Sequence, residues 1–140
     1  MVITRQLTDS ASASTASDIQ LGSCVTEIGQ GAFSGYTNIT DVEFPDSLTT
    51  IGVGAFSGSS VSSIDFNNTE TICNNAFANC QNISTLNIGS AVTSIGNSSF
   101  QNCSGFTNLT IGSAVTRIGD SAFQNCSGLT SIDIPDSVTS

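Results

Sequence analysis

At 140 residues the chain has the length of one domain, and only 9% of its residues are charged. Two arginines, no lysine and no histidine stand against eleven acidic residues, which gives a net charge of −9 at pH 7. This balance excludes nucleic acid as a partner and disfavours anionic membrane surfaces, since phosphate binding needs clustered cations. No apolar run is long enough to insert into a membrane, and residues 1–5 lack the apolar core of a secretory leader.

Residues 1–18 are predicted to form an N-terminal extension. They include the low-complexity stretch Ser10–Ser17, which is built from small residues. This composition favours a flexible linker or a loosely draped cap, and a degenerate half repeat that covers the first strand is the alternative. A cap is expected because the terminal repeat of a solenoid must hide its apolar face.

The spacing of five phenylalanines defines a repeat in residues 19–140. Phe33, Phe56, Phe77, Phe100 and Phe123 follow one another at steps of 23, 21, 23 and 23 along the chain. A period of about 20–29 residues with an L-x-x-L-x-L pattern is typical of leucine-rich-repeat solenoids. The one short step, from Phe56 to Phe77, is explained by two single deletions in turns, one on each side of Ile64. The sequence therefore predicts a mainly β solenoid of about five repeats that is open at its C-terminal end.

Each repeat is predicted to contain a short alternating strand whose two apolar residues face the interior. The apolar pairs are Ile19/Leu21, Val42/Phe44, Ile64/Phe66, Leu86/Ile88, Leu109/Ile111 and Ile132/Ile134. We expect these strands to stack in parallel on one face of the solenoid. Turns and short irregular or 3-10 segments are expected on the other face.

An apolar-x-x-Ile-Gly segment follows the strand in most repeats, as in Val115-Thr-Arg-Ile118-Gly119. We expect the glycine to adopt a backbone conformation that other residues disfavour. The repeat around Phe77 breaks the pattern because Cys73 follows Ile72. A strained or altered backbone is expected at that position.

The line Ile118-Gly-Asp-Ser-Ala-Phe-Gln-Asn-Cys-Ser-Gly-Leu-Thr-Ser-Ile-Asp-Ile-Pro135 resembles the BspA-type leucine-rich repeat. The Ile-Gly, Ala-Phe, Cys and Ile-x-Ile-Pro positions carry the resemblance, which covers residues 19–140. Proteins of that family are typically adhesion and binding proteins at the surface of bacteria and some protists, or secreted by them. The resemblance therefore implies a cell-surface or secreted protein. The missing leader points the other way, to a leader removed from this chain or to a chain never exported by that route.

No residue pattern indicates catalysis. Cys80, Cys103 and Cys126 recur at one position of three successive repeats and form a column, which is interpreted as small buried packing residues. A metal or redox column is the alternative, but there is no histidine and no C-x-x-C spacing. The usual bases for a serine or cysteine nucleophile are also absent, so no enzyme and no cofactor are predicted.

The outward-facing residues of the predicted strands are the candidate binding site. In chain order they are Asp41, Glu43, Asp65, Asn87, Thr110 and Asp133. The resemblance implies that such a row lines the concave face where partners bind. A calcium site would need several carboxylates to converge, and Asp41, Glu43 and Asp65 could do so, but Asn87 interrupts the column. A solvated acidic face is the favoured interpretation.

Two functions remain open. The first is a binding module that presents this face to a protein or a glycan, as the resemblance implies. The second is a structural component of a larger assembly, such as a decoration or fibre protein of a virion or a cell-surface array. It is favoured by the missing leader and by the chain stopping in mid-repeat at Ser140. That end indicates either a fragment of a longer array or an edge that stacks on a neighbouring chain.

Overall fold

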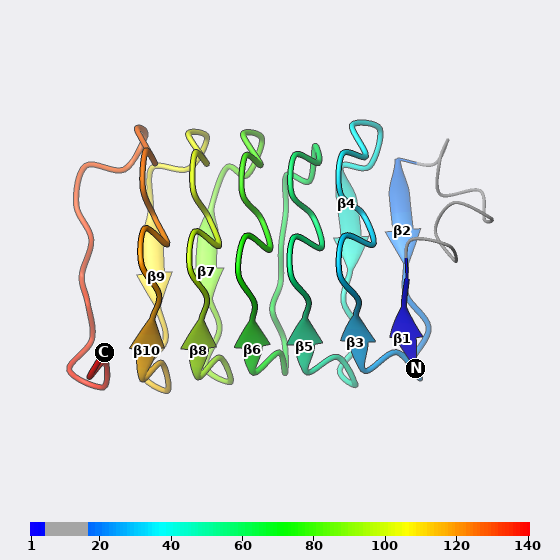
Figure 1. Cartoon of the computed structure of the whole chain (residues 1–140), viewed down its shortest axis with the longest axis horizontal. Helices are drawn as coiled ribbons and strands as arrows, with labels where there is room; N and C mark the ends of the chain where they lie inside the picture. The colour runs from blue at the N-terminus through cyan, green and yellow to red at the C-terminus, as the bar shows by residue number, and fades with distance from the viewer. Residues whose placement is uncertain (5–16) are drawn as a thin grey trace.

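The structure, a computed structural model, describes residues 1–4 and 17–140 and shows a parallel β-solenoid without helices in those ranges (Figure 1). The repeats stand side by side along the long axis of the molecule. This arrangement confirms the predicted fold. Most of the low-complexity stretch Ser10–Ser17 lies outside the described residues, so the boundary predicted at residue 18 stays a prediction.

Six strands form one unbroken parallel sheet, which we call the continuous sheet, in the order β1-β3-β5-β6-β8-β10. They are β1 (Val2–Ile3), β3 (Glu27–Ile28), β5 (Thr50–Ile51), β6 (Thr71–Ile72), β8 (Ser94–Ile95) and β10 (Arg117–Ile118). In every pair an isoleucine lies opposite an isoleucine. The longest sheet therefore lies at the Ile-Gly segment and not at the alternating strands. The sequence predicted strands only at the alternating segments, and the structure adds this sheet at the Ile-Gly segments.

The alternating segments form a second, interrupted set of strands. It contains β2 (Asp18–Gln20) paired with β4 (Asp41–Glu43), and β7 (Leu86–Ile88) paired with β9 (Leu109–Ile111). Between these pairs lies the third repeat, defined here by Ile64, Ile72 and Phe77, and only a single bridge from Asp41 to Ser63 reaches it. The predicted strands at residues 64–66 and 132–134 do not form. We call the outward side of this set the strand face.

The glycine of the Ile-Gly segment is required by close packing and not by an unusual conformation. A Cβ atom at Gly52 would lie 2.6 Å from the carbonyl oxygen of Ile28 in the preceding repeat, yet the φ of Gly52 is not left-handed. Apart from Asn67 in the third repeat, the left-handed residues described occupy two later positions in each repeat. These are Gly31, Gly54, Asn75, Ser98 and Ser121, followed by Gly35, Gly58, Asn79, Asn102 and Asn125.

Cys73 occupies the glycine position without the strain expected there. Its φ is not left-handed, and its backbone N–H donates to the carbonyl of Ile51 at 2.9 Å. This bond matches the one that Gly52 donates to Ile28 at 2.7 Å. The continuous sheet therefore passes through the third repeat without a break.

A column of stacked phenylalanine rings forms the centre of the core. Consecutive rings from Phe33 to Phe123 are 5.0, 5.1, 5.3 and 5.5 Å apart between centroids and within 8° of parallel. The first four rings are fully buried, whereas Phe123, in the last repeat, is partly exposed. Burial of this column confirms that the phenylalanines are core residues and explains why their spacing revealed the fold.

Candidate functional site

All six predicted site residues are exposed on the strand face. Asp41 and Glu43 lie at the two ends of β4, Asn87 is the central residue of β7, and Thr110 is the central residue of β9. Asp65 and Asp133 lie outside any strand. Exposure is what a binding surface requires, and the role of these residues in binding stays a prediction.

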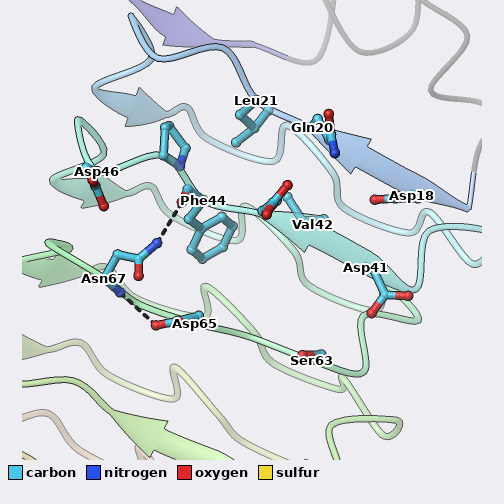
Figure 2. Close-up of a pocket in the computed structure, with 12 residues that line it drawn as sticks. Asp18, Gln20, Leu21, Asp41, Val42, Phe44, Asp46, Ser63, Asp65 and Asn67 are labelled. Carbon is cyan, nitrogen blue, oxygen red and sulfur yellow. Dashed lines mark hydrogen bonds between the residues drawn. The ribbon is translucent and has the colours of Figure 1, made fainter.

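The structure brings Asp41, Glu43 and Asp65 to one groove and leaves Asn87, Thr110 and Asp133 outside it. The groove has a volume of about 790 Å³ and crosses β2, β4 and the third repeat (Figure 2). It is lined by Asp18, Gln20, Leu21, Asp41, Val42, Glu43, Phe44, Pro45, Asp46, Ser63, Asp65 and Asn67. Five of these twelve residues are acidic, so the groove concentrates nearly half of the eleven carboxylates of the chain.

The groove lies where the third repeat loses part of its backbone pairing on the strand face. Within the ranges that the structure describes, the backbones of Ile64 and Asp65 form no hydrogen bond to the repeat before or after them. Two glycines at equivalent positions show how closely successive repeats pack on the strand face. A Cβ atom at Gly112 would lie 2.5 Å from the carbonyl oxygen of Gly89, whereas one at Gly89 would lie 3.7 Å from that of Asn67. The strand face is therefore tightly packed after the third repeat and looser at it.

Three hydrogen bonds order the groove, and two of them hold acidic side chains in place. The amide nitrogen Nδ2 of Asn67 donates to the carbonyl of Phe44 at 2.7 Å, and the Asn67 backbone N–H donates to Oδ1 of Asp65 at 3.1 Å (Figure 2). The hydroxyl of Thr40 donates to Oδ2 of Asp41 at 3.0 Å. Asn67 thereby links the third repeat through its side chain to Phe44, the residue that follows β4, where backbone pairing is missing.

Sequence reasoning missed Asp46 and Asn67 as members of the groove. The signal for them was the short step between Phe56 and Phe77, which marks the repeat whose backbone departs from the regular stack. Asn67 also stands where other repeats have Gly22, Pro45, Gly89 or Gly112. A polar side chain at a position otherwise held by glycine or proline indicates a changed connection.

The groove does not contain a metal site in the part of the chain that the structure describes. No three side chains of histidine, cysteine, aspartate or glutamate come close enough together there to hold an ion. Asp41 and Glu43 point away from the same strand at two-residue spacing, which keeps them about 7 Å apart along β4. The arrangement supports an extended acidic surface and not a coordination sphere.

The cysteine column is buried and chemically quiet. The thiols of Cys80, Cys103 and Cys126 donate to the carbonyls of Phe56, Phe77 and Phe100 at 3.0, 3.1 and 3.2 Å. Burial raises the pKa of Cys80 to about 11 and also raises the pKa values of Cys103 and Cys126. The thiols are therefore protonated at neutral pH, and all five cysteines are free of disulfides. Protonated, buried thiols are poor nucleophiles and poor metal ligands.

The family model for the BspA type leucine rich repeat region matches residues 11–71 and 54–140, with six copies of the repeat. The chain belongs to this family. Its Ile-Gly segments build the continuous sheet, and its Ala-Phe segments build the phenylalanine column. No curated protein matches the chain.

Three solved structures share the fold of this BspA-type chain. A leucine rich cell surface protein from Faecalibacterium prausnitzii A2-165 is 29% identical, with a TM-score of 0.77 over 81% of this chain and 31% of that one. A leucine-rich repeat protein from Bacteroides ovatus ATCC 8483 is 25% identical, with a TM-score of 0.61 over 91% of this chain and 39% of that one. The T. pallidum leucine rich repeat protein, at 24% identity, shares the fold with a TM-score of 0.78 over 84% of this chain and 58% of that one.

The chain spans between about a third and somewhat over half of the length of these solved proteins. It is a repeat protein of the kind that they represent. Across residues 1–4 and 17–140, the structure contains no helix that is long and apolar enough to cross a membrane.

Proposed function

We propose that this chain is a non-catalytic binding module of the cell surface, which recognises a protein or glycan partner through its strand face. The acidic groove at Asp41, Glu43 and Asp65 is the observation that carries the proposal, because it is a concave, solvated surface on a rigid scaffold. Concave sites on rigid elements are where solenoid proteins bind partners. The surface location is supported by the family and by the solved cell surface protein that is 29% identical.

The chemistry of the chain supports binding over catalysis. A catalytic site would need a base within hydrogen-bond reach of a nucleophile. The chain has no histidine or lysine, and its buried thiols have raised pKa values. The carboxylates of the groove are solvent-exposed and lie beside small polar groups such as Ser63 and Asn67, which suits recognition.

The experiment that tests the proposal compares two charge-matched variants on arrays of glycans and extracellular proteins. The first variant, Asp41→Asn/Glu43→Gln/Asp65→Asn, removes three charges from the groove. The second, Glu27→Gln/Glu70→Gln/Asp120→Asn, removes three charges elsewhere on the solenoid. We expect ligands of the wild-type chain to be lost by the first variant and kept by the second. Ligands that are kept by the first variant and lost by the second would overturn the proposal.

Assembly with neighbouring chains is the second candidate function. Ile132 and Ile134 are 40% and 49% exposed, and the backbone N–H groups of Ser121, Phe123 and Asn125 have no partner among the described residues. Their counterparts Ser98, Phe100 and Asn102 each donate to the next repeat at 2.8–2.9 Å. This edge could therefore pair with a further repeat or with another chain. Light scattering tests it: defined oligomers that Ile134→Glu dissociates support assembly, and a monomer at high concentration excludes self-assembly.

A further inference from the structure

The outward positions of the groove form a regular lattice. Asp18 lies opposite Asp41 and Gln20 opposite Glu43 in the paired strands β2 and β4, and Ser63 is bridged to Asp41 from the other side. Asp65 follows Ser63 by two residues, as Glu43 follows Asp41. Neighbouring repeats are about 4.8 Å apart, and alternate residues along one strand about 7 Å. Four of the six lattice positions are therefore carboxylates, and three of them, Asp18, Asp41 and Glu43, lie on paired strands at the spacings of a β-sheet.

These carboxylates have no countercharge in the described part of the chain. No ion pair joins them to another residue there, and the nearest described side-chain cation, Arg117, belongs to β10 at the far end of the continuous sheet. Carboxylates of one sign in a concave surface focus the electrostatic potential and attract cationic ligands. The whole chain has only two arginines and no lysine, which is fewer cations than the four carboxylates of this surface.

The groove also offers backbone groups to a partner strand. Asp65, which lines the groove, forms no backbone hydrogen bond to either neighbouring repeat within the described residues, and neither does the adjacent Ile64. Strand addition uses free main-chain groups of this kind for affinity and alternate side-chain sites for specificity. Leu21 and Pro45, both half-buried, add apolar surface to the wall of the groove.

The dimensions of the groove select an extended segment. From Asp41 to Pro45, before the turn at Asp46, the chain takes four residue steps, which at about 3.3 Å per residue is at most about 13 Å. A peptide of about five to six residues in extended conformation covers this length. Its alternate side chains would recur at about 7 Å, which is the spacing of Asp41 and Glu43.

Resting on the proposed function, we infer that the groove binds an extended peptide segment of a partner protein that carries lysine or arginine at alternate positions. The inference depends on the conjunction of the broken strand set, the lattice of carboxylates and the unpaired main chain. A neutral glycan can hydrogen-bond to the four carboxylates but leaves their charge uncompensated, and a single metal ion finds no cluster of ligands in the described residues. The peptide lies along β4 and the third repeat, with its basic side chains directed at Asp41, Glu43 and Asp65.

Two hexapeptides of equal composition test the inference by fluorescence anisotropy. The first alternates lysine with threonine, and the second contains the same residues with the three lysines in one block. We expect the alternating peptide to bind the wild-type chain at least tenfold more tightly than the blocked peptide. The groove variant Asp41→Asn/Glu43→Gln/Asp65→Asn should weaken this binding at least tenfold. The charge-matched variant Glu27→Gln/Glu70→Gln/Asp120→Asn should change it less than twofold.

Four outcomes overturn the inference. Equal binding of the two peptides, or equal loss in the two variants, would show attraction by net charge alone. Binding of calcium that depends on Asp41 and Asp65 and excludes the peptide would show a cation site instead. Failure of both peptides, together with an array ligand that the groove variant loses, would overturn the inference and leave the proposed function standing. Failure of both peptides without any array ligand that depends on the groove residues would overturn the proposed function as well.

Discussion

The two strand sets of this solenoid share the same repeats but differ in continuity. The continuous sheet passes through all the repeats, including the third, whereas the strand face is interrupted there by a segment without backbone pairing. Both deletions of the third repeat fall on the strand-face side, in the turns that flank Ile64. The repeat therefore tolerates irregularity on one side because the other side and the phenylalanine column hold the stack together. The irregular side is also where the groove forms.

The largest expected effect comes from the phenylalanine column that both strand sets share. Phe77→Ala removes a fully buried ring that stacks between Phe56 and Phe100 and contacts Phe66 edge-on at 5.9 Å. We expect it to lower the free energy of unfolding by about 3–5 kcal/mol in urea denaturation. Phe123→Ala, at a partly exposed ring with one stacked neighbour, should cost less than half as much. Equal losses of unfolding free energy in the two variants would show that stacking within the column does not determine the stability of the solenoid.

Alkaline pH should lower the stability of the fold through the buried thiols of the cysteine column. Burial raises the pKa of Cys80 from 9.0 to about 11, so the unfolded chain loses this proton at lower pH than the folded chain does. The free energy of unfolding should therefore fall as pH rises from about 9 to about 11, by up to about 3 kcal/mol for this thiol. Chemical denaturation at several pH values measures the slope. The variant Cys80→Ala should show a flatter profile, and an unchanged slope would contradict the account.

A pair of glycine variants compares the tight and loose parts of the strand face directly. Gly112→Ala places a Cβ atom 2.5 Å from the carbonyl oxygen of Gly89, and we expect a loss of about 1–3 kcal/mol in unfolding free energy. Gly89→Ala faces the third repeat at 3.7 Å, an ordinary contact, and should change stability by less than about 0.5 kcal/mol. Neither glycine has a left-handed φ, so conformation does not distinguish them. Equal losses of unfolding free energy in the two variants would show that the third repeat packs as tightly on the strand face as the others.

The smallest expected effect is a gain in stability. Thr69 is fully buried in the third repeat, and its hydroxyl has no partner among the described residues, while Val25, Leu48, Val92 and Val115 occupy the same position in other repeats. Thr69→Val should stabilise the chain by about 1 kcal/mol, because it removes an unsatisfied buried hydroxyl at nearly constant volume. Thermal denaturation measures the change. Thr49→Val, at an exposed threonine whose hydroxyl donates to the carbonyl of Thr26, serves as the control and should not stabilise.

The sequence predicted the features that depend on apolar periodicity and missed those that depend on backbone contact. The spacing of Phe33 through Phe123 revealed the core, because buried rings must recur in every turn. The sequence predicted strands only at the alternating pairs, because a two-residue strand such as Thr50–Ile51 carries no alternation to detect. The sequence also led us to explain the glycine at position 52 by an unusual backbone conformation, because the approach of Ile28 in the preceding repeat can be seen only in three dimensions.

The candidate site was predictable in part for the same reason. Exposure of Asp41, Glu43 and Asp65 follows from strand alternation. Their meeting at one groove depends on how far the third repeat departs from β4, and a deletion in the sequence gives no distance. Asp133 was assigned to the same row, but the strand that would have aligned it with Thr110 does not form.

Hydrogen exchange of individual backbone amides, measured by NMR, tests the division of the third repeat most directly. The amides of Thr71 and Cys73 donate to Thr49 and Ile51 in the continuous sheet, at 3.1 and 2.9 Å, whereas those of Ile64 and Asp65 have no backbone acceptor within the described residues. The account predicts slow exchange for Cys73 and exchange near the rate of an unstructured chain for Ile64 and Asp65. Equal protection of all four amides would show that the strand face is as continuous as the sheet behind it, and the proposed peptide groove would lose its basis.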